Sequence, residues 1–280
     1  MRVSKTVLTL GFAGVLGLVG CSSSDTNNLK LDIEGLADLG DSFVYEGWLI
    51  VGGNAVSAGT FSVTDGKMSR TGFSVGADDL DDASKYVLTI EPKPDSDPSP
   101  SKTHILAGDF SGNKAMLSVS HGAALGTDFA NAAGKYILAT PTDDGGTGDS
   151  ANEKSGVWWL DNSSGTARVG LTLPILPAGW KYEGWAVTAA GPVSTGTFLT
   201  ATGADDNAMG GPAFPGKDLL GTPPADIKTV VISVEPDPDN SAKPFLLKPL
   251  VRKAKSDDMA HTPYTMENKA ANNPTGTAVR

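Results

Sequence analysis

The sequence predicts an all-β protein made of two related, antiparallel β-sandwich-like units. The first observation is a pattern of short runs rich in Val, Ile, Thr and aromatic residues, separated by Gly, Pro, Asn and Asp, which is typical of strands and turns. The second is the content of 34 glycines and 18 prolines in 280 residues, which suits a turn-rich globular chain. The third is an internal repeat, which indicates that one architectural unit occurs twice.

The repeat consists of a hairpin and a later strand. Residues 45–61 begin Tyr-Glu-Gly-Trp and end Val-Ser-Ala-Gly-Thr-Phe. Residues 182–198 begin and end with nearly the same residues at the same spacing. Each segment predicts two strands joined by a turn. A further strand follows at 86–90 in the first copy and 230–234 in the second, and Glu-Pro ends the run in both. The loop before this strand is longer in the second copy, as expected of an insertion in a shared fold.

The N-terminus has the pattern of a secreted, lipid-anchored protein. Arg2 and Lys5 precede an apolar stretch at 7–20, which is too short to span a bilayer comfortably. Small residues lead into Cys21, the only cysteine of the chain, and three serines follow it. This order resembles a bacterial lipoprotein signal peptide, whose cysteine carries lipid such as palmitate. We therefore predict that residues 1–20 are removed as a signal peptide and that Cys21 is lipidated.

The predicted lipid places the protein at the cell envelope, outside the cytoplasm. The residue after Cys21 is Ser22 rather than Asp, which favours the outer membrane if the source is Gram-negative. A formal net charge of −10 argues against nucleic acids as partners, because neutralising phosphate needs clustered Lys and Arg. The expected partners are the membrane, through the lipid, and an envelope protein. With a single cysteine the chain has no internal disulfide, so its stability must come from the apolar core.

The rest of the chain divides around the two copies. A lipidated cysteine and tether at 21–28 lead into the first β domain at 29–110, where Leu, Leu and Ile alternate with polar residues from the start. The second β domain, 111–251, is expected to have an extra N-terminal hairpin, made of antiparallel strands at 135–140 and 156–160. The polar tail, 252–280, has no apolar period and is predicted to be disordered. Whether the two domains share one core stays open.

The order of motifs in the second copy resembles a known family. Leu-x-Leu-Pro-x-Leu-Pro-Ala-Gly at 171–179 is followed by Tyr-x-x-Trp at 182–185, Pro-Val-Ser-x-Gly-x-Phe at 192–198 and a strand ending Val-Glu-Pro at 234–236. This order resembles the extracytoplasmic C-terminal domain of anti-sigma-K-type factors (RskA-like), and the first copy repeats most of it. The resemblance implies a β-sandwich-like domain outside the membrane. Those factors also carry a sigma-binding domain and a transmembrane helix, which have no counterpart here, so a separate use in envelope signalling or docking is implied.

No residue pattern predicts catalysis, so we expect a protein that is not an enzyme and needs no cofactor. The three histidines, His104, His121 and His261, stand at no spacing from Asp, Glu or Cys that indicates a metal site or a triad. No Gly-x-Ser-x-Gly elbow occurs, and the only thiol is the predicted anchor. A hydrolase with an unrecognised carboxylate site stays as a weaker hypothesis.

The loops after the two Glu-Pro pairs are weak candidates for a metal site. They carry Asp95 and Asp97 in the first copy and Asp237 and Asp239 in the second, and hard cations bind clustered oxygen ligands. Asp beside Pro and Ser is also ordinary turn chemistry, and neither loop has the order of an EF-hand. Turns are the simpler interpretation, so no metal is predicted.

The tryptophans offer a second hypothesis for function. Trp158 and Trp159 are neighbours in a predicted strand, so their side chains point to opposite faces and one of them is expected to be exposed. An exposed tryptophan could dock a partner or stack on a sugar, which makes a surface carbohydrate- or ligand-binding lipoprotein the alternative to protein docking. Trp48 and Trp185 recur at equivalent places and are expected in the core. Gly59 and Gly196 are expected at a bulge or at a close contact between strands.

Overall fold

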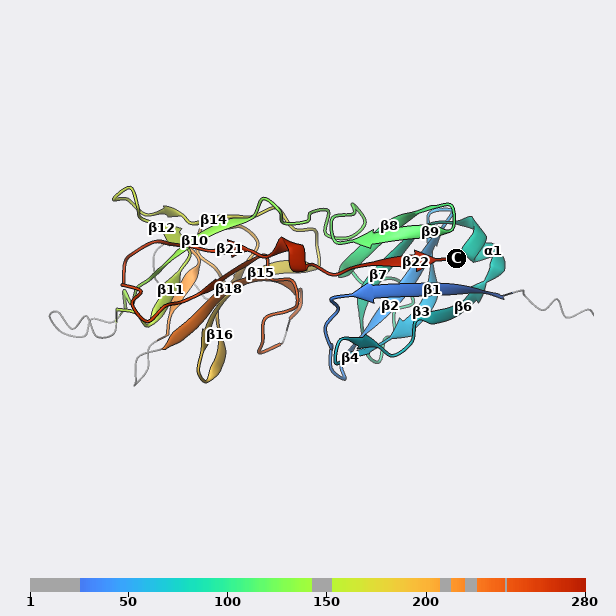
Figure 1. Cartoon of the computed structure of the whole chain (residues 1–280), viewed down its shortest axis with the longest axis horizontal. Helices are drawn as coiled ribbons and strands as arrows, with labels where there is room; N and C mark the ends of the chain where they lie inside the picture. The colour runs from blue at the N-terminus through green and yellow to red at the C-terminus, as the bar shows by residue number, and fades with distance from the viewer. Residues whose placement is uncertain (1–25, 143–152, 207–212, 220–225, 240) are drawn as a thin grey trace, which may run out of the picture.

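The computed structural model describes residues 26–142, 153–206, 213–219, 226–239 and 241–280 (Figure 1). The predicted signal peptide 1–20 and Cys21 lie outside the described residues. Antiparallel strands dominate, and within these ranges helical structure is limited to α1 (Ala77–Asp82) and the 3-10 turn η1 (Ala270–Asn272). The predicted all-β, antiparallel class is therefore confirmed. No helix in the described part of the chain is long and apolar enough to cross a membrane.

The first half of the chain forms one strongly curved sheet. Its eight strands run in the order β3 (Asn54–Phe61), β2 (Phe43–Val51), β7 (Ala83–Pro92), β8 (His104–Ser111), β9 (Lys114–Ser118), β22 (Thr275–Val279), β1 (Thr26–Glu34) and β6 (Gly72–Gly76). The two edge strands, β3 and β6, approach each other, so the sheet nearly closes into a barrel. A small hairpin of β4 (Val63–Thr64) and β5 (Lys67–Met68) connects them.

β1 shows why these residues form strands. Leu29, Leu31 and Ile33 are buried, whereas the residues between them, Lys30 and Asp32, are exposed, which is the period of two expected of a half-buried strand. The strand begins at Thr26, so the predicted tether 21–28 is wrong for its last three residues. The backbone of these polar residues pairs with β6, and pairing of this kind leaves no trace in apolar periodicity.

The second half forms two smaller sheets. One runs in the order β16 (Gly191–Phe198), β15 (Trp180–Thr188), β18 (Ile227–Pro236), β19 (Leu250–Lys253) and β21 (Glu267–Asn268). The other runs β14 (Leu171–Thr172), β10 (Ala133–Leu138), β11 (Gly156–Trp158) and β17 (Gly216–Asp218), with β20 (Tyr264–Thr265) also pairing β10. Strands β12 (Leu160–Asp161) and β13 (Arg168–Val169) form a separate pair. The predicted extra hairpin is confirmed, because β10 and β11 pair antiparallel.

The two repeated hairpins have the same register. In β2–β3, Gly47 pairs with Gly59 and Trp48 with Ser57, and in β15–β16 the equivalent residues pair in the same way. One extra residue therefore bulges from the second strand of each hairpin. Gly59 has φ of 106° and Gly196 has φ of 115°, a backbone conformation that favours glycine. The expected bulge at these two glycines is confirmed.

The C-terminus differs most from the sequence prediction. The prediction of a disordered tail at 252–280 is wrong, because β22 lies between β1 and β9 in the first sheet (Figure 1). Arg280, directly after β22, donates hydrogen bonds to the carbonyls of Leu80, Asp81 and Ala83. β9, which we assigned to the second domain, pairs with β8 in the same sheet. Both strands are short, and β22 is held by backbone bonding between distant parts of the chain, which a local apolar pattern does not report.

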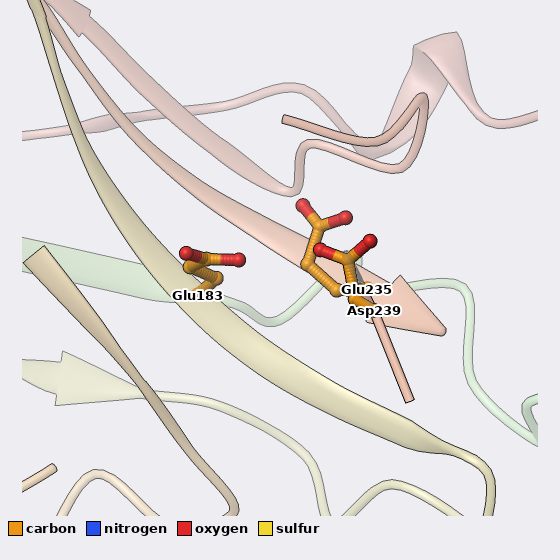
Figure 2. A group of neighbouring side chains, drawn as sticks. All are labelled: Glu183, Glu235 and Asp239. Atoms are coloured by element: carbon orange, nitrogen blue, oxygen red, sulfur yellow. The ribbon is translucent and has the colours of Figure 1, made fainter. Parts of the chain in front are cut away.

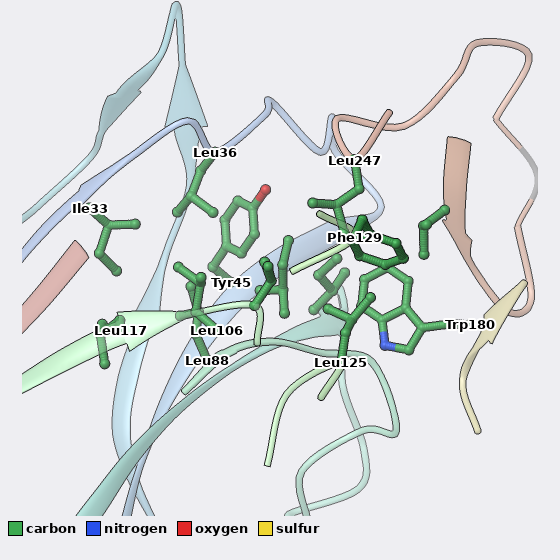
Figure 3. Close-up of a cluster of buried hydrophobic side chains, with 14 of the residues drawn as sticks. Ile33, Leu36, Tyr45, Leu88, Leu106, Leu117, Leu125, Phe129, Trp180 and Leu247 are labelled. Carbon is green, nitrogen blue, oxygen red and sulfur yellow. The ribbon is translucent and has the colours of Figure 1, made fainter. Parts of the chain in front are cut away.

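The core runs continuously through both halves. Figure 3 shows Tyr45 and Leu106 of the first half in one cluster with Phe129, Trp180 and Leu247, and the same cluster extends to both sheets of the second half. Trp180 is 1% exposed. The question whether the halves share a core is therefore answered: they do. Burial of this apolar surface is the main stabilising contribution available to a chain without disulfides.

Candidate functional site: a repeated carboxylate network

The tryptophans expected at the surface are buried. Trp158 is 3% exposed and Trp159 is 0% exposed. They do point to opposite faces, since Trp159 belongs to the main core and Trp158 to a smaller cluster against which Phe214 packs. Trp158 Nε1 donates to the carbonyl of Ala139 (3.2 Å), and Trp159 Nε1 donates to Thr195 Oγ1 (3.2 Å). The prediction of an exposed tryptophan face is wrong here, because the segment before β17 covers the side that the sequence left open.

Two glutamates lie on one face of each repeated sheet, and both are buried in the second copy. Glu183 of β15 lies opposite Ser233 of β18 in the register, and Glu235 is two residues further along β18. Residues two apart on a strand share a face, so both carboxylates project from the same side. Glu46 and Glu91 have the same relation in β2 and β7, since Glu46 lies opposite Thr89.

Each glutamate of the second copy accepts a defined set of hydrogen bonds. Ser194 Oγ donates to Glu183 Oε1, and Ser233 Oγ donates to Glu235 Oε1. The backbone N–H of Phe245 donates to the same Glu235 oxygen at 2.8 Å. Trp185 Nε1 donates to Ser233 Oγ at 2.8 Å, which connects the buried indole to the carboxylates.

The first copy repeats every one of these bonds. Ser57 donates to Glu46, Thr89 donates to Glu91 Oε1, and Trp48 Nε1 donates to Thr89 Oγ1 at 2.8 Å. The N–H of Ser101 donates to Glu91 Oε1 at 2.9 Å, in the role of Phe245. Glu91 and Glu235, at the strand ends, therefore each accept one hydroxyl and one backbone hydrogen bond.

The two copies differ at the third carboxylate. In the second copy, one oxygen each from Glu183, Glu235 and Asp239 lie within 4.8 Å of one another (Figure 2). In the first copy the equivalent Asp95 joins no such group among the described residues. Both aspartates make the same turn, because Asp95 Oδ1 accepts from the N–H of Asp97 at 2.9 Å and Asp239 Oδ1 from the N–H of Ser241 at 2.8 Å. Such an Asx turn is the simpler interpretation that the sequence offered for these loops.

The other two candidate aspartates take no part in a metal cluster among the described residues. Asp97 Oδ1 accepts from the N–H of Ser99 at 2.9 Å, a second Asx turn. Asp237 forms an ion pair with Lys181 at 3.0 Å. Of the four weak candidates, only Asp239 lies in a cluster of carboxylates among the described residues.

Burial dominates the electrostatics of the glutamates. It raises the pKa of Glu183 and of Glu235 to about 7 each, although hydrogen bonds from Ser194 to the first and from Ser233 and Phe245 to the second act in the opposite direction. The charge of Asp239 raises both pKa values further. Burial also raises the pKa of Glu91. Near neutral pH the pair in the second copy is therefore partly protonated, and interacting groups of this kind titrate as a unit.

A cavity opens beside the network of the first copy. It measures about 360 Å³ and is lined in part by Glu46, Thr60, Phe61 and Glu91. A cavity of about 340 Å³ in the second copy shares the equivalent Thr197 and Phe198 in its lining but is not lined by Glu183 or Glu235. A third cavity of about 320 Å³ lies between the halves and reaches Asp239.

The three histidines lie apart from these networks. His104 Nδ1 is 2.9 Å from the carbonyl of Ala123, His121 Nε2 is 3.2 Å from Asp109 Oδ2, and His261 Nε2 is 3.0 Å from Glu153 Oε2. His121 Nδ1 also accepts from the N–H of Ala123 at 3.0 Å, and these contacts do not form a triad.

Sequence reasoning missed the glutamate pairs, although a signal was present. Both Tyr-Glu-Gly-Trp and Glu-Pro keep their glutamate in the two copies of the repeat. Only the register of β15 against β18 shows that these two glutamates meet, and register was not part of the sequence prediction.

The family comparison falls on the first half of the chain. The model of the C-terminal domain of anti-sigma-K factor RskA matches residues 4–104. This range includes the apolar stretch at 7–20 and the first copy, up to the beginning of β8. The resemblance to RskA-like domains is therefore confirmed over this range, while the second copy, whose motifs the sequence resemblance also used, lies beyond it. No curated protein and no solved structure matches the chain.

Proposed function

We propose that the chain is a lipid-anchored, non-enzymatic protein of the bacterial cell envelope, whose two RskA-like units act in envelope signalling by docking another protein. The observation that carries this proposal is the match to an anti-sigma factor domain over residues 4–104. It is supported by the Cys21 motif, which follows the apolar stretch directly. The duplication of the unit is supported by the identical hairpin registers of the two copies.

The proposed anchor would hold one end of the molecule at the membrane. Only residues 22–25 separate Cys21 from the start of β1, and four extended residues reach roughly 14 Å. The start of β1 lies beside the end of β6 and the acidic helix α1, at one end of the long axis (Figure 1). The second half of the molecule would then face away from the membrane, where a partner can reach it.

The anchor is tested by the variant Cys21→Ser. Wild-type cells fed an alkyne-tagged fatty acid should label the protein, and the labelled protein should sediment with membranes. The variant should carry no label and should leave the membrane fraction. Label retained in Cys21→Ser, or a wild type without label, would contradict the proposed anchor.

Docking is tested by photo-crosslinking in intact cells. A photoreactive residue at Ile175, which is 90% exposed in the second half, should give a discrete adduct with one envelope protein. The matched position is Met116 on β9, which is 67% exposed but lies in the membrane-proximal half. Equal adducts at both positions, or none at Ile175, would argue against docking through the distal half.

Carbohydrate binding through an exposed tryptophan is not proposed. Trp158 and Trp159 carried that alternative, and both side chains are buried. The repeated glutamates also give no preference for a hydrolase, because the same hydrogen bonds recur in two copies of a structural unit.

A further inference from the structure

We propose that Glu183, Glu235 and Asp239 form a binding site for a divalent cation, with calcium as the ligand that the oxygen donors favour. The three residues come from different places in the fold: β15, the end of β18 and the loop that follows β18 (Figure 2). This inference stands apart from the proposed anchoring and docking.

The spacing of the carboxylates suits one ion. One oxygen from each residue lies within 4.8 Å of the other two. Calcium binds oxygen at roughly 2.3–2.6 Å, so two oxygens on the same ion are separated by at most about 5 Å. The three oxygens can therefore reach one central ion with little movement of the backbone.

An unpartnered oxygen points independently to a ligand. Glu235 is 1% exposed, and its Oε1 accepts the bonds from Ser233 and Phe245. Its other oxygen, Oε2, is buried and has no hydrogen-bond partner among the described residues. A buried carboxylate oxygen without a partner is costly, and a bound cation would satisfy it.

The two glutamates of the site have no ion-pair partner among the described residues. Asp206 adds negative charge at Glu183, and the charge of Glu235 acts on the nearby Lys248. Burial lowers the pKa of Lys248, which weakens it as a counter-charge. A dication would balance the excess.

The first copy provides a matched control within the same chain. Glu46, Glu91 and Asp95 occupy the equivalent positions, but Glu46 is only half-buried, whereas Glu183 is buried. The Asx turn is common to both copies, since Asp239 Oδ1 accepts from the N–H of Ser241 at 2.8 Å as Asp95 Oδ1 does from Asp97. These three do not form a close group of carboxylates in the described structure. The proposed site therefore belongs to the second copy alone.

The test uses the full chain, purified in detergent and stripped with a chelator. Terbium is titrated while tryptophan is excited, because the hydrogen-bonded path from Trp185 through Ser233 places an indole close to Glu235. We expect sensitised terbium emission at one ion per chain, and its displacement by calcium chloride. Glu235→Gln and Asp239→Asn should each weaken binding tenfold or more, whereas Glu91→Gln and Asp95→Asn should leave it unchanged.

Three results would overturn the proposal. One is that the wild type gives neither sensitised terbium emission nor a heat of calcium binding in titration calorimetry. Another is an equal loss of binding in Asp95→Asn and Asp239→Asn. The third is a melting temperature that rises on acidification but does not rise when calcium is added. In that case protons shared among the carboxylates, and not a cation, would neutralise the cluster. Asp239 lies on a solvent-accessible loop, so its variant remains informative if Glu235→Gln fails to fold.

Discussion

At the scale of single residues, the repeated glutamates are ionisable groups held by specific hydrogen bonds, which apolar burial alone does not explain. Each is tied to its sheet by a serine or threonine hydroxyl, and the strand-end glutamates also accept a backbone N–H. The same bonds occur in both copies, so they act as part of the unit. Only the second copy brings a third carboxylate to them, which distinguishes two otherwise equivalent sites.

The pKa values of Glu183 and Glu235 predict how stability depends on pH. Both are raised from 4.5 to about 7 in the folded state. Between these values the folded protein binds more protons than the unfolded chain, so the free energy of unfolding falls as pH rises from about 4.5 to 7 and is level above 7. Each shift corresponds to at most about 3 kcal/mol, and the pair contributes less than twice that because the two groups interact.

The double variant Glu183→Gln, Glu235→Gln should remove most of this pH dependence. Urea denaturation with a chelator present should show the wild type less stable at pH 8 than at pH 5, and the variant nearly equal at the two pH values. Glu34→Gln, at the exposed end of β1, is the control and should keep the wild-type slope. A wild type that gains stability between pH 5 and pH 7 would contradict the prediction.

At this scale the sequence could predict only the features that are encoded within a short, continuous segment. The glycines of the bulge and the burial of Trp48 and Trp185 followed from a repeated local motif. The burial of Trp158 and the meeting of Glu183 with Glu235 required knowledge of which segment lies opposite. Neither relation is encoded within a short stretch of chain.

At the scale of elements, hairpins were predictable and distant pairings were not. The β2–β3 and β15–β16 hairpins carry their apolar residues and turn residues in one continuous segment. β22 instead pairs with β1 and β9, which are far from it in the sequence. Its Thr-Gly-Thr-Ala-Val sequence has little apolar content, so the strand was mistaken for part of a disordered tail.

Deletion of residues 275–280 should therefore destabilise the first half severely. The deletion removes β22 and leaves the facing edges of β1 and β9 unpaired, and it also removes the hydrogen bonds of Arg280. We expect a loss of several kcal/mol or more, or aggregation through the exposed edges. Urea denaturation checks this, with Arg280→Ala as the control that keeps the strand. Unchanged stability after the deletion would show that β22 is not integral to the sheet.

At the scale of the whole molecule, the two halves are joined by core packing as well as by chain. Trp180 begins β15 in the second half, yet it packs in one cluster with Leu247, Phe129 and Leu125 that continues to Leu106 and Tyr45 of the first half (Figure 3). The C-terminal segment also returns from the second half to complete the first sheet (Figure 1). Both connections predict that the halves unfold together.

Trp180→Ala tests this coupling directly. Truncating a buried tryptophan typically costs about 3–5 kcal/mol, and here the cavity would lie where the two halves meet. Calorimetry should show one unfolding transition in the wild type and one, at lower temperature, in the variant, with hydrogen exchange accelerated in β2 and β7 as well as in β15 and β18. Ile175→Ala, at a side chain that is 90% exposed, should leave the transition in place. The opposite result would be two separate unfolding transitions in Trp180→Ala, with β2 and β7 still protected from hydrogen exchange. The halves would then be independent folding units, and the shared core would not make their unfolding cooperative.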